Sequence, residues 1–196
     1  AFDGMSVKLK AIILKSQEIV VRAALKEESH QRSTNSVTVI DAASIKRADG
    51  SHFQDIMESI PNFNAAGGTS RPRYFQIRGI GERSHYFAEG PPNFSVGFVI
   101  DDIDLSGLGM AGLLYDLEQV EVFKGPQSAM FGPNALAGLI SMRFTEPKDE
   151  FDGHLRLTGG SDNIQRFNGI LNVPLGKSLA LRVALESGAG NGFREN

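Results

Sequence analysis

Three places in the sequence carry residues at spacings used for chemistry, and each lacks a part that the chemistry needs. Gly107–Gly112 has the GxGxxG spacing of a dinucleotide-binding loop, but the helix expected after it is short and no acidic residue follows at the required distance. A run beginning at Asp102 is similar to the start of a calcium loop, yet its twelfth position is Leu113 instead of glutamate. His85 and Glu89 are four residues apart, with no third ligand placed for a metal. No nucleophile is paired with a base in a recognisable motif, so we predict no enzyme activity, no metal site and no cofactor.

Composition narrows the class of protein further. The chain has 196 residues, a formal net charge of -3 and no cysteine. A mildly acidic chain is not expected to bind nucleic acid as its main partner. No apolar run reaches the ~18 residues that a membrane-spanning helix needs. The sequence does not exclude a membrane β-barrel, because the strands of such a barrel leave only weak alternating signals.

The elements between Val37 and Pro147 predict an α+β domain. Short β-branched and apolar runs alternate with short helical patterns and glycine-rich loops. The expected strands are Val37–Asp41, Arg73–Arg78, Val96–Asp101, Val120–Phe123 and Leu139–Phe144. The expected helices are a short one capped by Asp41 and ending at Lys46, one over His52–Ser59 capped by Ser51, and one over Leu113–Gln119.

The pattern changes after Pro147 to strict alternation of apolar and polar residues. Three such runs are separated by turn sequences at Gly159–Asn163 and Pro174–Ser178, which makes them consecutive hairpins with one apolar and one polar face. A soluble β-sandwich alternates in the same way, so the period alone does not decide which side faces water.

The stretch Leu117–Pro147 carries the most specific motif, LEQVEVFKGPQSAMFGPNALAGLISMRFTEP. It resembles the signature of the plug domain of TonB-dependent outer-membrane receptors. Gln76–Gly81 and Ser95–Asp102 resemble two further motifs of that family, with Asp102 in place of the usual glycine. The resemblance implies an α+β plug domain, a small mixed sheet with short helices, followed by the opening antiparallel strands of a transmembrane β-barrel.

The resemblance also divides the chain. Residues 1–35 are expected to be an N-terminal periplasmic segment with a TonB box, 36–147 the plug domain, and 148–196 the first strands of an incomplete outer-membrane β-barrel. Open strand edges in lipid leave backbone groups unpaired, so three strands cannot form a barrel alone. We therefore expect the chain to be a piece of a longer receptor.

A short extended segment near the N-terminus resembles the TonB box. Gln17–Ala23 is rich in β-branched residues, has no obvious partner strand, and precedes a polar stretch, Lys26–Asn35, that is typical of a flexible linker. The alternative interpretation is an ordinary edge strand. By the resemblance, the residues expected to contact TonB are Glu18, Ile19, Val20, Val21, Arg22 and Ala23.

Other residue roles follow from the same resemblance. Arg78 and Lys124 match plug cations that face glutamates on the barrel wall, although lysine at 124 lacks the bidentate fork of the family's arginine. Loops at Asn64–Arg73, Gly81–Phe94 and Ser106–Ala111 match the apices that face the extracellular ligand. The candidate ligand-binding residues, able to meet an anionic chelate or to stack on a planar group, are Arg71, Arg83, His85, Tyr86, Phe87 and Phe94. The alternative is that these side chains pack within their own loops.

The function implied is TonB-dependent active transport of a scarce ligand across the outer membrane. Ferric siderophores are the ligands the resemblance points to first, and haem, cobalamin, nickel chelates and oligosaccharides stay open. The implied partners are the TonB C-terminal domain with its inner-membrane energising complex, an extracellular metal chelate and outer-membrane lipid. The alternative from another class is a truncated, stand-alone plug module that binds a ligand or a protein in the periplasm.

Overall fold

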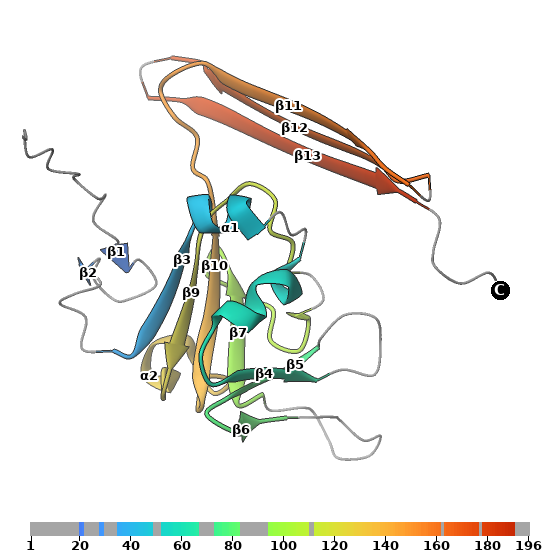
Figure 1. Ribbon diagram of the computed structural model, residues 1–196. Helices are drawn as coiled ribbons and strands as arrows, with labels where there is room; N and C mark the ends of the chain where they lie inside the picture. Colours follow the sequence, from blue (N-terminus) through green and yellow to red (C-terminus); the bar gives the residue numbers. More distant parts are fainter. Residues whose placement is uncertain are drawn as a thin grey trace, which may run out of the picture.

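The computed structural model describes residues 20–21, 28–29, 35–48, 52–66, 73–82, 94–109, 112–161, 163–176 and 178–190. Across these residues, no helix is both long and apolar enough to cross a membrane. The described part forms an α+β domain and a separate three-stranded sheet (Figure 1). Two further short strands, β1 (Val20–Val21) and β2 (Glu28–Ser29), lie beside the α+β domain.

A five-stranded mixed sheet is the centre of the α+β domain, in the order β3-β9-β10-β7-β8. β10 and β7 are parallel, and the other neighbouring pairs are antiparallel. The mixed sheet confirms the fold class expected from the sequence. Its strands are β3 (Val37–Asp41), β7 (Val96–Ile100), β8 (Ile103–Asp104), β9 (Leu117–Lys124) and β10 (Gly138–Phe144).

The two faces of this sheet differ because side chains alternate along β9. Val120 and Val122 are fully buried in the main apolar cluster, on the face that the helices cover. Phe123 belongs to a second, smaller cluster on the opposite face, together with Leu139 and Val21. Both faces are therefore covered, and β9 is protected from water on each side.

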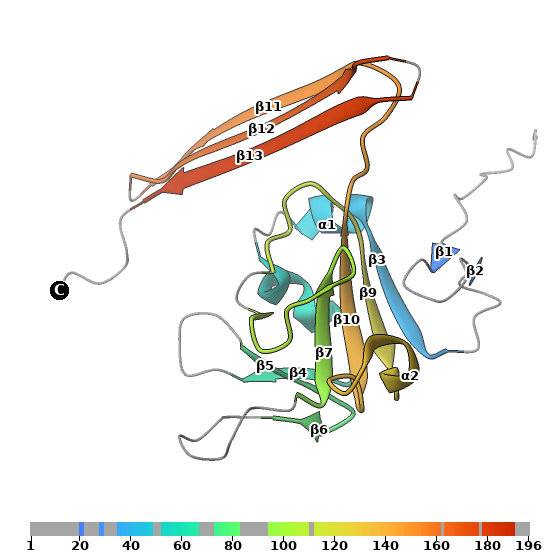
Figure 2. The same cartoon turned by 180° about the vertical axis from the view of Figure 1, so that it is seen from behind.

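Short helices cover the face with the main apolar cluster (Figures 1 and 2). α1 (Ala42–Ala48) begins where Asp41 Oδ1 accepts a hydrogen bond of 2.8 Å from the backbone N–H of Ser44. This confirms the predicted cap, although the helix runs two residues beyond Lys46. Another short helix, α2 (Ser128–Phe131), follows β9, and its Phe131 packs against the second cluster on the opposite face.

The second helix, η1 (Phe53–Ser59), is a 3-10 helix. Its cap is His52 and not the predicted Ser51, which lies outside the described residues: His52 Nδ1 accepts a 3.1 Å hydrogen bond from the N–H of Gln54, and its own N–H donates to Asp55. Phe53, Ile56 and Ile60 are buried and Met57 is partly buried, at the i, i+3, i+4 and i+7 spacing of one helix face.

The predicted helix over Leu113–Gln119 is wrong. Asp116 has a positive φ of 57°, which no right-handed helix allows, and β9 begins at Leu117. Leu117 pairs with Phe144 of β10, and Leu113 forms an isolated bridge with His52. Pairing with β10 therefore overrides the local helical preference of this segment.

A small antiparallel sheet packs beside the helices. It consists of β4 (Phe63–Ala66), β5 (Tyr74–Ile77) and β6 (Ile80–Gly81). The ring of Phe53 meets those of Phe63 and Phe75 edge to face, with centroids 5.7 Å apart in both pairs. These aromatic contacts join η1 to the small sheet, from which the loops after β4 and β6 leave.

The third sheet contains the predicted hairpins, β11 (Asp152–Gly159), β12 (Gln165–Pro174) and β13 (Ala180–Ala189). They lie across the end of the α+β domain near α1 (Figures 1 and 2). One face carries large apolar side chains that are 40 to 73% exposed: Leu155, Leu157, Phe167, Leu171, Leu181, Val183 and Leu185. The polar face is turned toward the α+β domain, which is the arrangement expected of barrel strands with lipid outside and a plug inside.

We expect Asp41→Ala to lower the free energy of unfolding by about 1 kcal/mol, because it removes the cap of α1. Hydrogen bonds from Ser44 lower the pKa of Asp41 below its usual value of 3.8. The contribution of the cap is therefore complete above that value and is lost as pH falls through the lower folded-state pKa. Denaturant unfolding of the detergent-refolded chain tests this. Asp41→Asn keeps the acceptor and should stay close to wild type, and an equal loss in both variants would contradict the assignment.

Candidate functional site: an N-terminal strand, a loop node and a docking surface

The two described residues of the predicted TonB box form a strand that is docked on the domain. β1 pairs with β2 in antiparallel fashion, so the segment has a local partner that the sequence did not reveal, and two residues of the expected flexible linker are strand. The side chain of Val21 is 0% exposed and packs in the cluster with Phe123 and Leu139. Glu18, Ile19, Arg22 and Ala23 lie outside the described residues.

Two polar side chains of β9 lie beneath this strand. Gln119 Nε2 donates a 3.1 Å hydrogen bond to the backbone carbonyl of Val20, and the same amide nitrogen donates to a carboxylate oxygen of Glu121. Glu121 is only 2% exposed. Neither residue stood out in the sequence. Their signal was present, since they are polar residues that alternate with valines in a strand otherwise built for burial.

Arg78 and Lys124, the two cations predicted to face the barrel wall, are both hydrogen-bonded to Ser36. Arg78 Nη2 donates to the Ser36 hydroxyl at 3.0 Å, and the backbone N–H of Lys124 donates to the Ser36 carbonyl at 2.7 Å. Burial, and then the charge of Arg78, lower the pKa of the Lys124 ammonium group. Within the described part of the chain, neither side chain forms an ion pair with a carboxylate. Two neighbouring cations of this kind are suited to an acidic partner, and the identity of that partner stays a prediction.

The three loops predicted to face ligand start or end at one cluster of residues, the loop node, which consists of Arg73, Tyr74, Phe94 and Gly107. Arg73 Nε donates a 3.0 Å hydrogen bond to the Gly107 carbonyl, and the ring of Phe94 stacks on that of Tyr74 with centroids 6.2 Å apart. Gly107 has φ +81°, and a Cβ there would lie 2.1 Å from Phe94 Cζ. Phe94 is thus half-buried within the node, so its predicted contact with ligand would use the remaining ring surface. The other candidates lie outside the described residues: Arg71, Arg83, His85, Tyr86 and Phe87.

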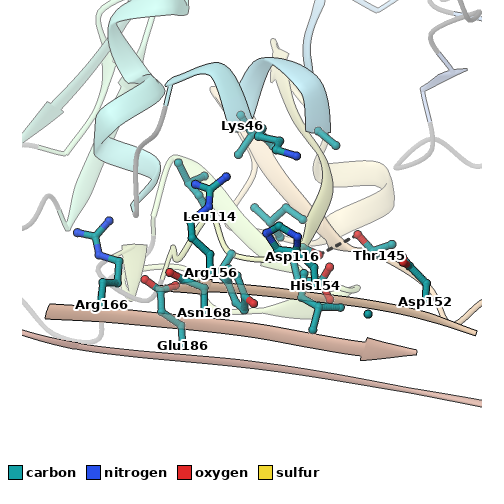
Figure 3. A pocket seen from close by; sticks show the side chains of 16 residues that line it. Lys46, Leu114, Asp116, Thr145, Asp152, His154, Arg156, Arg166, Asn168 and Glu186 are labelled. Carbon is teal, nitrogen blue, oxygen red and sulfur yellow. Dashed lines mark hydrogen bonds between the residues drawn. The ribbon is translucent and has the colours of Figure 1, made fainter. Parts of the chain in front are cut away.

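The polar face of the hairpin sheet docks on the α+β domain around a cavity of about 450 Å³ (Figure 3). Lys46 of α1 reaches into it from one side, and His154, Arg156 and Glu186 line it from the sheet. At the edge of the cavity, the carboxylate of Asp116 accepts hydrogen bonds from Nε and Nη2 of Arg182, at 2.8 and 2.6 Å. None of these side chains was singled out from the sequence, because pairing across the domain boundary leaves no local pattern.

Among the described residues, no cluster of three or more histidine and acidic side chains is placed to hold a metal ion. The geometry thus consists of a docked strand, a loop node and an internal docking surface. Comparison with known proteins identifies this arrangement. The profile of the TonB-dependent Receptor Plug Domain matches residues 29–139.

The chain belongs to the TonB-dependent receptor family. It consists of the plug domain and the first strands of the β-barrel. It is 25% identical over 150 residues to the vitamin B12 transporter BtuB of Vibrio vulnificus (strain CMCP6), covering 74% of this chain and 23% of that protein. It is 41% identical over 49 residues to the ferrioxamine receptor of Yersinia enterocolitica, covering 25% of this chain and 7% of that protein. The chain thus spans less than a quarter of the length of either relative.

Solved structures show the same fold. The pyoverdine outer membrane receptor FpvA of Pseudomonas aeruginosa PAO1 matches with a TM-score of 0.72 and 19% identity, over 89% of this chain and 25% of that one. The siderophore receptor PiuA of Acinetobacter baumannii matches with a TM-score of 0.66 and 25% identity, over 82% of this chain and 22% of that one. Because more than four-fifths of the chain is matched, the likeness extends beyond the plug into the barrel strands.

We expect Gly107→Ala to disturb the loop node by more than its backbone strain alone. Gly132 offers a matched control, since it has φ +79° and open space around its Cβ position. Gly132→Ala should cost only the ~1–2 kcal/mol of a left-handed backbone, whereas Gly107→Ala must also displace the Phe94 ring. Unfolding free energies of the two variants measure the difference, and equal losses would show that the ring contact is not part of the node.

We expect Gln119→Ala to loosen β1. The chain has no cysteine, so Val21→Cys gives a single thiol that a maleimide can reach only when β1 leaves the sheet. Loss of one hydrogen bond of about 1 kcal/mol should speed labelling roughly threefold to tenfold. Gln165→Ala, on the exposed end of β12, is the control. Equal labelling rates with and without Gln119 would contradict a role for its amide.

Proposed function

We propose that this chain is the N-terminal part of a receptor that performs TonB-dependent active transport of a ferric siderophore across the outer membrane. The observation that supports this most directly is the hairpin sheet, whose polar face holds the plug while its apolar face is exposed. A sheet of that kind suits a barrel wall with lipid outside and a plugged lumen inside. On a stand-alone periplasmic module the same apolar face would be an aggregation liability, so this alternative is disfavoured.

The N-terminal strand supports the proposed contact with TonB. Residues Glu18–Ala23 would add as a strand to the TonB C-terminal domain, where backbone hydrogen bonds supply most of the affinity. β1 already has extended geometry at Val20–Val21 but is bound to β2 and to Gln119. Release of β1 is thus the step that would make the box available. An outer membrane has no ATP, so the energising complex would act by pulling on this segment.

The proposed ligand class is supported by the names of the relatives. One curated relative is a ferrioxamine receptor and one matching structure is a siderophore receptor, while another relative is a vitamin B12 transporter. For this chain, the proposed ligand contacts are the cations Arg71, Arg83 and His85 and the aromatic rings Tyr86, Phe87 and Phe94. The node at Gly107 supports the proposal by holding the ends of their loops together.

We also propose that the parts keep the roles implied by the family. Residues 1–35 would lie on the periplasmic side with the TonB box, 36–147 would form the plug inside the barrel, and 148–196 would belong to the barrel wall. Arg78 and Lys124 would face acidic residues of that wall. Their shared position at Ser36, with no carboxylate paired to them among the described residues, supports this role.

Val20→Pro in the full-length receptor should abolish uptake of ⁵⁵Fe-labelled siderophore and leave binding of the same siderophore unchanged. Proline removes the N–H that a strand ladder needs but keeps the carbonyl that Gln119 contacts. Val20→Ala keeps the N–H and should transport close to the wild-type rate. A set of ferrioxamine, catecholate and pyoverdine complexes serves as the probe. Wild-type uptake by the proline variant would contradict the proposed TonB contact.

A further inference from the structure

Three cross-strand neighbours of the hairpin sheet lie in one row where the chain passes from the plug into the sheet, a place called the exit of the plug below. Two of them make the contacts that hold the plug there. Asn172 of β12 and Arg182 of β13 are direct cross-strand partners, and Asp152 of β11 is the partner of Asn172 on the other side. Because cross-strand partners share a face, all three side chains lie on the polar side of the sheet. The row is at the end of the sheet where the chain enters it from the plug.

Arg182 binds the plug itself. Its guanidinium group makes two hydrogen bonds to the carboxylate of Asp116, and the two side chains are only 10% and 7% exposed. The backbone carbonyl of Asp116 also accepts hydrogen bonds of 2.9 and 3.0 Å from the N–H and hydroxyl of Thr145, which follows β10. One residue thus connects the start of β9, the end of β10 and the third hairpin strand.

Asn172 binds the connection between plug and sheet. Its side-chain amide donates to the carbonyls of Lys148 and Glu150, at 2.8 and 2.6 Å, and its oxygen accepts from the N–H of Lys148 at 2.9 Å. Asn172 is 0% exposed. A buried amide with all three bonds to one segment fixes that segment closely, since an unpaired alternative would leave polar groups buried.

We propose that Arg182 and Asn172 form a clamp that keeps the plug seated against the barrel wall, and that the contact with Asp116 keeps the pore closed in the resting receptor. This inference rests on the proposed function, because it needs a barrel around the plug. It differs from the predicted contacts of Arg78 and Lys124, which lie at the other end of β9. The clamp is built entirely from residues of this chain.

The burial of the Asp116–Arg182 pair separates it from an ordinary surface pair. Arg143 and Asp102 lie 3.8 Å apart with side chains 24% and 71% exposed, and such a pair contributes little. Removing one member of a buried pair instead leaves an uncompensated charge in the interface. A lone buried guanidinium or carboxylate would favour states in which the plug has moved from the sheet and water reaches the group.

The test uses the full-length receptor in the outer membrane of a Gram-negative host, with vancomycin as the probe because an intact outer membrane excludes it. We expect Asp116→Asn and Arg182→Gln each to raise vancomycin influx at least about tenfold, since each leaves the other group buried without its partner. The double variant should leak no more than the worse single variant, because both substitutions break the same contact. Arg143→Gln is the matched control and should not leak. Wild-type influx in both single variants, or additive leaks in the double variant, would overturn the clamp.

A second variant guards against simple misfolding. Asp116→Cys combined with Arg182→Cys should leak, and a short crosslinker with two thiol-reactive methanethiosulfonate groups should return influx to the wild-type level. Residues 1–196 contain no other cysteine to react, and any cysteine elsewhere in the receptor is first replaced by serine. Failure of the crosslinked receptor to close would overturn the proposal even if the single variants leak. The assay needs neither ligand nor TonB. A receptor absent from the outer membrane would therefore contradict the proposed function, whereas one that is inserted and never leaks contradicts only the clamp.

Discussion

The hydrogen-bonded ladder of β9 is the constraint on which the rest of the structure depends. This strand is paired with β3 on one side and β10 on the other, and its side chains are buried on both faces. Three contacts with proposed functional meaning start from it or from its ends. Gln119 holds β1, Asp116 immediately before it holds Arg182, and Lys124 at its end lies beside Arg78. A central strand with two partners resists displacement, so these three contacts are held at fixed distances from one another.

The contacts at the two ends of the plug differ in strength, and this difference indicates which end is released first. β1 is held by a two-residue strand pair, one side-chain hydrogen bond and the burial of Val21. The exit of the plug is held by a bidentate ion pair, three hydrogen bonds of Asn172 and the covalent chain itself. Because few contacts among the described residues hold β1, it is suited to local release, whereas the point where the chain leaves the plug is suited to remain in place.

Motifs and periodicity predicted much of this structure. The alternation after Pro147 predicted three hairpin strands with one apolar face, and the motif at Leu117–Pro147 predicted a plug domain. Failures occurred where tertiary contacts decide the local structure. The helix expected before Val120 is a turn and a strand because β10 offers a partner, and β1 pairs with a segment that has a linker-like composition. Asp116 and Arg182 are 66 residues apart in the sequence, so no local signal could join them.

The most direct test of the central claim is the size and location of the native product, measured by immunoblotting fractionated source cells with an antibody against the plug. We expect a band in the outer membrane several-fold larger than the 21.2 kDa of this chain. That result would place the plug and its first strands within a complete receptor. A band of about 21 kDa in the soluble periplasm would contradict it, because the exposed apolar face would then have no lipid to meet.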